Sequence, residues 1–222
     1  MKLNVCKIEV GNQRSKATVK EGIVMKIGVL SLQGAVAEHM RGIEQSGAEA
    51  LEIKRVEQLD EIHGLIIPGG ESTTIGHLMR LYGFIDAIQL FSEQGKPVFG
   101  TCAGLIVIAK EIEGQDVRHL QLMDITVRRN AFGRQVASFE VHLDINGIEE
   151  PVKGVFIRAP LISSVGLNVE VLATHNQEIV AAREGHLLVT SFHPELTDDF
   201  KIHQYFVAMV KETQGRTIQH QV

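Results

Sequence analysis

The chain has 222 residues, of which 44% are hydrophobic and 22% charged, and its formal net charge is −5 at pH 7. This is the composition of a globular protein, and the length is sufficient for one large α/β domain. The sequence has no run of about 18 apolar residues, which excludes a membrane-spanning helix. The negative charge disfavours a nucleic-acid partner, because binding to phosphates usually requires a basic face.

Residues 1–24 differ from the rest of the chain. They carry five Lys or Arg against two Glu and lack the apolar core of a secretory signal. We expect a disordered or non-native extension here, the alternative being a loosely attached N-terminal arm. Met25 opens an apolar segment, and we expect residues 25–222 to form a single domain. Without an export signal, Cys6 and Cys102 are expected to be reduced thiols of a cytoplasmic protein.

In the first half of this domain, short apolar segments alternate with segments of helical period. The expected strands are Lys26–Leu32, Ala48–Ile53, Gly64–Pro68 and Pro97–Thr101. The expected helices are Ala35–Gln45, Ser72–Leu81 with Ser72 as its N-cap, Phe84–Phe91 and Ala103–Ile112. Such alternation is typical of βαβ units with a parallel sheet, whose strands are buried on both faces and therefore continuously apolar.

After about residue 122 the sequence becomes rich in short strands. The candidates are Asp124–Arg128, Val136–Ile145, Gly154–Arg158, Val169–Ala173, Ile179–Ala182 and Leu187–Phe192, and Asp198–Lys211 is expected to close the chain as an amphipathic helix. We therefore predict an α/β fold of three layers with a mixed, mainly parallel central sheet.

The segment Gly100-Thr101-Cys102-Ala103-Gly104 joins an apolar strand to a helix. It has the G-x-nucleophile-x-G pattern of a nucleophile elbow, with cysteine as the nucleophile. Small neighbours permit the sharp turn, the helix start stabilises a thiolate, and the N–H of Ala103 is free to face an oxyanion. The alternative is a buried structural cysteine at a strand–helix junction, and the motif alone does not decide between the two.

The segment Phe192-His193-Pro194-Glu195 follows the last predicted strand. Pro194 favours extended geometry at His193, and residues two apart in an extended segment point to the same side, so His193 and Glu195 are expected to share a cleft. A carboxylate beside an imidazole fixes its tautomer and supports the imidazolium formed in catalysis. Taken alone, a purely structural turn is the more common explanation of such a segment.

The segment Pro68-Gly69-Gly70-Glu71-Ser72-Thr73 lies between a predicted strand and a helix. Its glycines expose backbone N–H groups that suit an oxyanion or a phosphate, but the lysine of a Walker-type phosphate loop is absent. We therefore expect an oxyanion hole formed by the N–H groups of Gly70 and Ala103. An ordinary strand-to-helix turn is the alternative.

These three segments follow three strands of the predicted sheet, at the edge where open α/β folds bind ligands. The stretches that carry a resemblance to a known family are IGVLSLQGAVAEH at 27–39, LIIPGGESTT at 65–74, GKPVFGTCAGLI at 95–106, RNAFGRQ at 129–135, VFIRAP at 155–160 and SFHPEL at 191–196. Together they resemble the class I, triad-type glutamine amidotransferases, which have a flavodoxin-like fold. Many of these have a Cys-Leu-Gly-x-Gln elbow. The elbow here, Cys-Ala-Gly-Leu-Ile, points to the subfamily of glutaminase subunits of pyridoxal 5′-phosphate synthases, in which residues 1–24 have no counterpart.

The resemblance implies a catalytic triad of Cys102, His193 and Glu195 and a glutamine pocket. The implied substrate contacts are Gly70, Glu71, Ser72, Arg129, Ile157 and Arg158. An arginine suits the α-carboxylate of a free amino acid, although a structural ion pair is the alternative for each of the two. Gln33 and Arg134 are expected at the partner surface, and Gln33 could instead reach the site. The remaining histidines, His39 included, are expected to be surface or core residues, and no cluster has metal-ligand spacing.

The implied reaction is hydrolysis of L-glutamine to L-glutamate and ammonia through a γ-glutamyl thioester, without a cofactor. The implied partner is the synthase subunit of pyridoxal 5′-phosphate synthase, in a hetero-oligomer. Two alternatives stay open. One is a glutaminase that serves a different synthase, or a related cysteine hydrolase of the same fold. The other is a non-catalytic regulatory subunit, which the intact triad disfavours.

Overall fold

The structure, a computed structural model, describes residues 24–129 and 138–219. The expected N-terminal extension, apart from Val24, and Arg134 lie outside the described residues.

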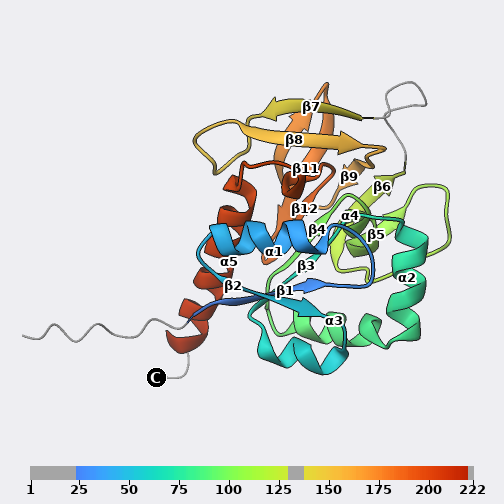
Figure 1. The fold of residues 1–222 in the computed structure, drawn as a ribbon. Helices are drawn as coiled ribbons and strands as arrows, with labels where there is room; N and C mark the ends of the chain where they lie inside the picture. Colours follow the sequence, from blue (N-terminus) through green and yellow to red (C-terminus); the bar gives the residue numbers. More distant parts are fainter. Residues whose placement is uncertain (1–23, 130–137, 220–222) are drawn as a thin grey trace, which may run out of the picture.

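The first half of the fold alternates strands and helices as the sequence predicts (Figure 1). Its elements are β1 (Lys26–Leu30), α1 (Val36–Gln45), β2 (Glu49–Ile53), the 3₁₀ turn η1 (Val56–Glu61), β3 (Gly64–Ile67), α2 (Ser72–Leu81), α3 (Phe84–Glu93), β4 (Val98–Thr101) and α4 (Ala103–Ile108). Most predicted ends differ from these by one or two residues, because an apolar pattern does not mark the last hydrogen bond of an element.

The second half is rich in strands. Its elements are β5 (Ala109–Ile112), β6 (Met123–Arg128), β7 (Ser138–Leu143), β8 (Val152–Ile157), β9 (Leu161–Val165), β10 (Glu170–His175), β11 (Glu178–Glu184), β12 (Leu187–Thr190), the 3₁₀ turn η2 (Pro194–Leu196) and α5 (Lys201–Gln219). Among the described residues, no helix is both long and apolar enough to cross a bilayer.

At two places the structure has a strand that the sequence did not predict. The helix expected over Ala103–Ile112 ends at Ile108, because Ala109–Ile112 pairs in parallel with β6 and extends the sheet. Strand pairing here overrides a helical apolar pattern. Strand β9 was not expected, because its sequence LISSV has only two apolar residues before the serines. It nevertheless pairs antiparallel with β6.

The central sheet has the strand order β2-β1-β3-β4-β12-β11-β9-β6-β5, with β10 paired to β11. The strands from β2 to β12 in this order are parallel, and antiparallel pairing begins at β11. This confirms the predicted mixed, mainly parallel sheet. Strands β3, β4 and β12 are adjacent and parallel, so the segments that follow them, which contain Gly70, Cys102 and His193, leave the sheet at the same edge.

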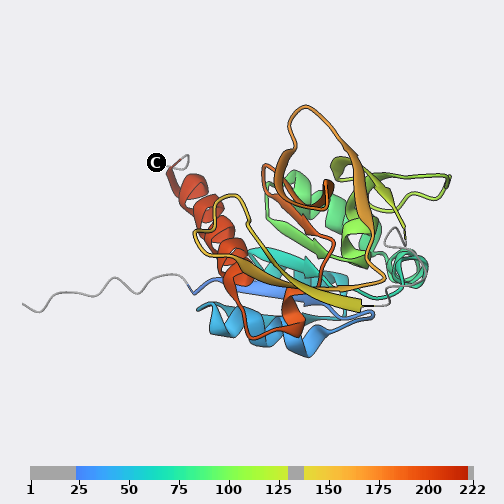
Figure 2. The ribbon, with the colours of Figure 1, turned by 90° about the horizontal axis from the view of Figure 1, so that it is seen from above.

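Both faces of the sheet are covered, which gives the predicted three layers. On β3 and β12, Ile67 and Val189 point into a core shared with α2, α3 and α4, whereas Ile66 and Leu188 point into a second core shared with α1, α5 and the β7–β8 hairpin. Successive residues of a strand point to opposite faces, which explains why such strands are apolar throughout. Figure 2, turned by 90°, separates α1 from the strands that it covers.

Helix α4 packs with its backbone directly against the sheet. A Cβ atom at Gly104 would lie 2.0 Å from the carbonyl oxygen of Ile67 in β3, and one at Gly100 would lie 2.6 Å from the backbone of Gly104. Real Cβ atoms do not approach so closely. The two glycines of the elbow therefore allow the contact between helix and sheet that places Cys102.

We expect Gly104→Ala to lower the free energy of unfolding by about 1–3 kcal/mol, the usual effect of overpacking, because the neighbouring atom belongs to a backbone that cannot rotate away. Urea denaturation measures the change. Gly215→Ala is the matched control: Gly215 also lies in a helix, but it has open space around it and should become slightly more stable. An unchanged Gly104→Ala would contradict the close contact.

Candidate active site

Cys102 occupies a sharp turn between β4 and α4. Its backbone has φ 50° and ψ −102°, a left-handed conformation that side chains rarely adopt and that costs about 1–3 kcal/mol. The turn is held on both sides. The N–H of Cys102 donates to the carbonyl of Thr190 in β12 (2.8 Å), and its own carbonyl accepts from Ile106 in α4 (3.3 Å). The thiol is buried, with 7% of the residue exposed.

His193 and Glu195 lie in hydrogen-bond contact, with 2.7 Å between Nδ1 and Oε1. The N–H of His193 donates to the carbonyl of Val155 in β8 (2.8 Å). The expectation of an extended segment is wrong beyond His193, because Pro194 opens the 3₁₀ turn η2, which contains Glu195. Proline suits the first position of a helical turn. The carboxylate therefore reaches His193 by a turn of the backbone.

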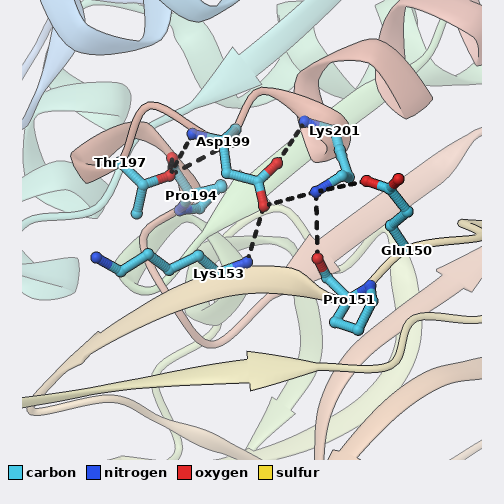
Figure 3. A network of polar contacts seen from close by, with 7 residues as sticks. All are labelled: Glu150, Pro151, Lys153, Pro194, Thr197, Asp199 and Lys201. Carbon is cyan, nitrogen blue, oxygen red and sulfur yellow. Dashed lines mark hydrogen bonds and ion pairs between the residues drawn. The ribbon is translucent and has the colours of Figure 1, made fainter.

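A polar network fixes the chain after Glu195 (Figure 3). Thr197 Oγ1 donates to the carbonyl of Pro194 (3.0 Å) and accepts from the N–H of Asp199 (3.1 Å). The Asp199 carboxylate accepts from the N–H of Lys153 in β8 (3.0 Å) and from the N–H of Lys201 at the start of α5 (3.2 Å). The network links η2, β8 and α5 by hydrogen bonds, so the segment that contains His193 and Glu195 is held in place from both sides.

The electrostatics of the site favour a protonated imidazole. Burial alone would lower the pKa of His193, but hydrogen bonds with Cys102 and Glu195, together with the charges of both, raise that pKa to about 10. Burial likewise opposes ionisation of Glu195, but nearby His39 and the hydrogen bond from His193 keep the pKa of Glu195 below its ordinary value. The arrangement therefore suits an imidazolium at His193, beside the sulfur of Cys102 and supported by a buried carboxylate.

A cavity of about 390 Å³ opens beside the sulfur, at the small end of the range for ligand pockets. Its lining consists of Gly70, Glu71, Ser72, Cys102, Ala103, Ile106, Arg129, Ile157, Arg158, Pro160 and His193. All six residues predicted to contact substrate are in this set. The sequence reasoning missed Ile106 and Pro160. Ile106 lies four residues after Cys102 and hence on the same helix face, a signal that could have identified it.

Glu71 has a structural function within this cavity. Its carboxylate accepts from the N–H groups of Thr73 (3.3 Å) and Thr74 (2.8 Å), which makes Glu71 the N-cap of α2. The prediction of Ser72 as N-cap is therefore wrong: the longer Glu71 side chain folds back onto the helix, and Ser72 is the first helical residue. Arg129 Nη2 lies 2.9 Å from Glu71 Oε1, so this arginine already has a carboxylate partner.

Arg158 differs from Arg129. It follows β8 with a left-handed φ of 46°, and within residues 24–129 and 138–219 it forms no side-chain hydrogen bond or ion pair. Its guanidinium is therefore available to a carboxylate in the cavity. Gln33 Oε1 accepts from the N–H of Glu71 (2.8 Å), so Gln33 reaches the glycine loop.

Within the described part of the chain, no group of three or more His, Cys, Asp or Glu side chains is arranged to hold a metal ion. The residues that line the cavity offer hydrogen-bond donors, two guanidinium groups and a thiol. This set fits a small polar molecule with a carboxylate.

Comparison with known proteins agrees with this chemistry. The sequence profile of the SNO glutamine amidotransferase family matches residues 29–212. The chain is 66% identical over 188 residues to the pyridoxal 5′-phosphate synthase subunit PdxT of Niallia circulans (85% of this chain, 99% of that one). It is 63% identical over 190 residues to PdxT of Anoxybacillus flavithermus (86% and 99%).

Two solved structures have a fold similar to that of this chain. A crystal structure of a glutamine amidotransferase superposes with a TM-score of 0.80 at 46% identity, covering 83% of this chain and 98% of that one. The structure of PurLQS from Thermotoga maritima superposes with a TM-score of 0.59 at 17% identity, covering 88% and 100%. At that identity the second likeness shows the fold alone.

We expect Glu71→Ala to lower the free energy of unfolding by about 1 kcal/mol at pH 7, because α2 loses its N-cap. Hydrogen bonds from Thr73 and Thr74, opposed by partial burial, lower the pKa of Glu71 from 4.5 to about 2. A lowered pKa means that the stabilisation is complete above pH 4.5 and is lost as the pH falls through about 2.

The difference in free energy of unfolding between Glu71→Ala and wild type should therefore shrink as the pH falls through that acidic range. Urea denaturation at several pH values measures it. Glu44→Ala is the control, since Glu44 is exposed near the C-terminal end of α1, away from any helix N-terminus. A difference that persists undiminished at the acidic end of the range would contradict the capping role.

Proposed function

Because this chain belongs to the SNO glutamine amidotransferase family, we propose that it is the glutaminase subunit of a pyridoxal 5′-phosphate synthase. It hydrolyses L-glutamine to L-glutamate and ammonia and passes the ammonia to the synthase subunit. The names of the relatives at 63% and 66% identity support the choice of synthase. The observation that carries the chemistry is that Cys102 and His193 line one cavity and that the buried carboxylate of Glu195 bonds His193.

In the first step, Cys102 is the nucleophile and His193 holds its proton. The thiolate attacks the side-chain amide carbon of glutamine, forming a carbon–sulfur bond while the carbonyl oxygen becomes an oxyanion. Two backbone N–H groups stabilise that oxyanion by donating hydrogen bonds. One is that of Ala103 at the start of α4, where the helix dipole adds to the stabilisation, and the other is that of Gly70 in the loop after β3.

In the second step, His193 donates its proton to the departing nitrogen, the carbon–nitrogen bond breaks, and ammonia leaves a γ-glutamyl thioester on Cys102. His193, now neutral, takes a proton from water as the water attacks the thioester, which releases glutamate and restores the thiolate–imidazolium pair. Glu195 stabilises the imidazolium and fixes the orientation of the ring. The need for a reduced thiol also supports the proposed cytoplasmic location.

The charges in the cavity set the orientation of glutamine. Arg158 has a guanidinium without a partner among the described residues, so it binds the α-carboxylate. Glu71 presents a carboxylate that attracts the α-ammonium group, and its ion pair with Arg129 holds that carboxylate in place. Ser72 and Ile157 complete the contacts. The side-chain amide is then directed toward Cys102.

We place this activity in one domain over residues 25–222, which the family match over 29–212 supports, and we place residues 1–24 outside it. Arg134 is proposed as a partner contact on the family resemblance. Gln33 has additional support, because its side chain binds the glycine loop, so a partner that touches Gln33 would act directly on the oxyanion hole.

Cys102→Ala should abolish glutaminase activity, leaving less than about 1% of the wild-type rate, while folding and glutamine binding persist, because loss of a covalent nucleophile removes several orders of magnitude of rate. Ammonia release measures the rate, and calorimetry measures binding. A glutamine-like electrophile should label Cys102 and spare Cys6, and Cys6→Ala should remain active. Activity above about 1% in Cys102→Ala would refute the proposed nucleophile.

The glutaminase rate should rise when the synthase subunit binds. Ammonia at neutral pH is mostly ammonium, a poor nucleophile, so release without an acceptor is wasteful. The peptide between Gly69 and Gly70 provides the means, since glycine backbones rotate at little cost, and docking would select the orientation that completes the oxyanion hole.

The measurement compares the isolated chain with the same chain in saturating synthase subunit. The Cys102→Ala chain with the synthase is the control for background activity. Equal rates for the isolated and the docked chain would show that the site is complete alone and would refute activation by the partner.

A further inference from the structure

The second oxygen of Glu195 is buried without an ordinary hydrogen bond. Oε1 accepts a hydrogen bond from Nδ1 of His193, but no hydrogen bond from the described residues reaches Oε2. A buried carboxylate oxygen left without a partner is destabilising. The polar atom placed against it is Nε2 of His39, at 3.4 Å, with both side chains fully buried.

His39 lies at the centre of a buried polar series. It belongs to α1, and its Nε2 also lies 3.3 Å from Oγ1 of Thr101, the residue before Cys102. Its other ring nitrogen, Nδ1, lies 3.1 Å from Nε2 of His203 in α5. The series therefore extends from His193 through Glu195 and His39 to His203, and it joins the elbow to two helices of the covering layer.

The neighbours of the two buried histidines determine their tautomers. Burial, partly offset by Glu195 and Glu38 and reinforced by His193, lowers the pKa of His39. Burial and His39 lower the pKa of His203 to about 3, with Glu195 opposing. Both rings are therefore neutral at pH 7, and each has one N–H.

Only one arrangement of those protons suits the site. With the proton of His39 on Nε2, its N–H faces Glu195 and Thr101, while its Nδ1 accepts from the Nε2–H of His203. Nδ1 of His203, which has no partner among the described residues, is then a bare lone pair. The reverse arrangement would turn a lone pair of His39 toward the carboxylate and would bury an N–H of His203 without an acceptor, which costs more.

One side of the His203 ring packs closely against the backbone of α1. A Cβ atom at Gly42, one turn after His39 in α1, would lie 2.7 Å from Nε2 of His203. The helix backbone thus lies directly on the ring. The contact between α1 and α5 thus keeps the ring of His203 next to that of His39.

We propose that His39 is a positioning residue of the active site: its Nε2–H, shared with Thr101, gives the second carboxylate oxygen of Glu195 an electropositive neighbour at 3.4 Å, and His203 fixes the tautomer of His39. The inference rests on the proposed function, because it gives Glu195 its orienting role toward His193. With the imidazolium at one oxygen and the N–H of His39 near the other, rotation of the carboxylate away from His193 is disfavoured. His39 touches neither glutamine nor the reacting sulfur, so its effect passes through Glu195.

The first experiment reads the tautomer directly in the unmodified protein. Long-range proton–nitrogen NMR spectra of a sample with ¹⁵N-labelled histidine distinguish protonated from bare ring nitrogens. We expect Nε2 of His39 to be protonated and Nδ1 bare at pH 7, and the same for His203. A proton on Nδ1 of His39, with Nε2 bare, would overturn the proposal. This measurement needs no substrate, so it stands whether or not the proposed glutaminase function fails.

The second experiment compares two amides at the same position. In His39→Gln the side-chain NH₂ reaches the place of Nε2, whereas in His39→Asn the shorter amide reaches only that of Nδ1. We expect kcat to fall about 10- to 100-fold in His39→Asn, as for other residues that orient a catalytic group, with KM for glutamine unchanged. His39→Gln should stay within about 3-fold of wild type, because it keeps the donor.

His186→Asn is the matched control, since this histidine bonds Ser92 at the opposite edge of the sheet and should leave kcat unchanged. Equal kcat values for His39→Gln and His39→Asn would overturn the positioning role. Absence of glutaminase activity from the wild-type chain, even with saturating synthase subunit, would instead refute the proposed function and leave the positioning role to be decided by the NMR measurement.

Discussion

The active site depends on one strained turn, the left-handed backbone of Cys102. A conformation that costs about 1–3 kcal/mol persists only where the surroundings hold it, and here β12 binds the N–H of Cys102 while α4 binds its carbonyl. Helix α4 can take that position because Gly104 lies against the backbone of Ile67 in β3. The contacts that hold the turn therefore also connect β3, β4 and β12. These three parallel strands place the glycine loop, the sulfur and His193 at one edge of the sheet.

The second constraint is the burial of charge behind that edge. Glu195 is buried, and an unpaired buried carboxylate would be strongly destabilising. The structure offsets this with His193 on one oxygen and the ring of His39 near the other. Phe99 lies edge-on to His39 with ring centroids 6.4 Å apart, so an aromatic side chain packs against the middle of the polar series. Low polarity around the series strengthens each of its interactions, and at His193 the hydrogen bonds and charges of Cys102 and Glu195 outweigh the opposing effect of burial on the pKa.

Apolar periodicity predicted the first half of the fold well, because its parallel strands are buried on both faces and leave an unmistakable pattern. It failed where the partner of a segment decides its structure. Ala109–Ile112 continues the pattern of a helix, yet it pairs with β6 at the sheet edge. Leu161–Val165 has too few apolar residues to signal a strand, and β6 supplies its hydrogen bonds. Glu195 was expected on an extended segment, but the proline that restricts His193 also begins a turn. Long-range pairing leaves no local signal in such segments.

The site shows the same division between what residue type predicts and what only geometry reveals. Residue type alone does not show whether Arg129 and Arg158 bind a substrate carboxylate or form structural ion pairs. In the structure, Arg129 pairs with Glu71, which is itself occupied in capping α2, whereas Arg158 has no partner among the described residues. Two identical side chains in one cavity therefore present different charge: a neutralised pair on one wall and, within the described part of the chain, an unpaired cation on the other. On the proposed function, this difference in charge between the two walls would orient an amino acid in the cavity with its carboxylate toward Arg158.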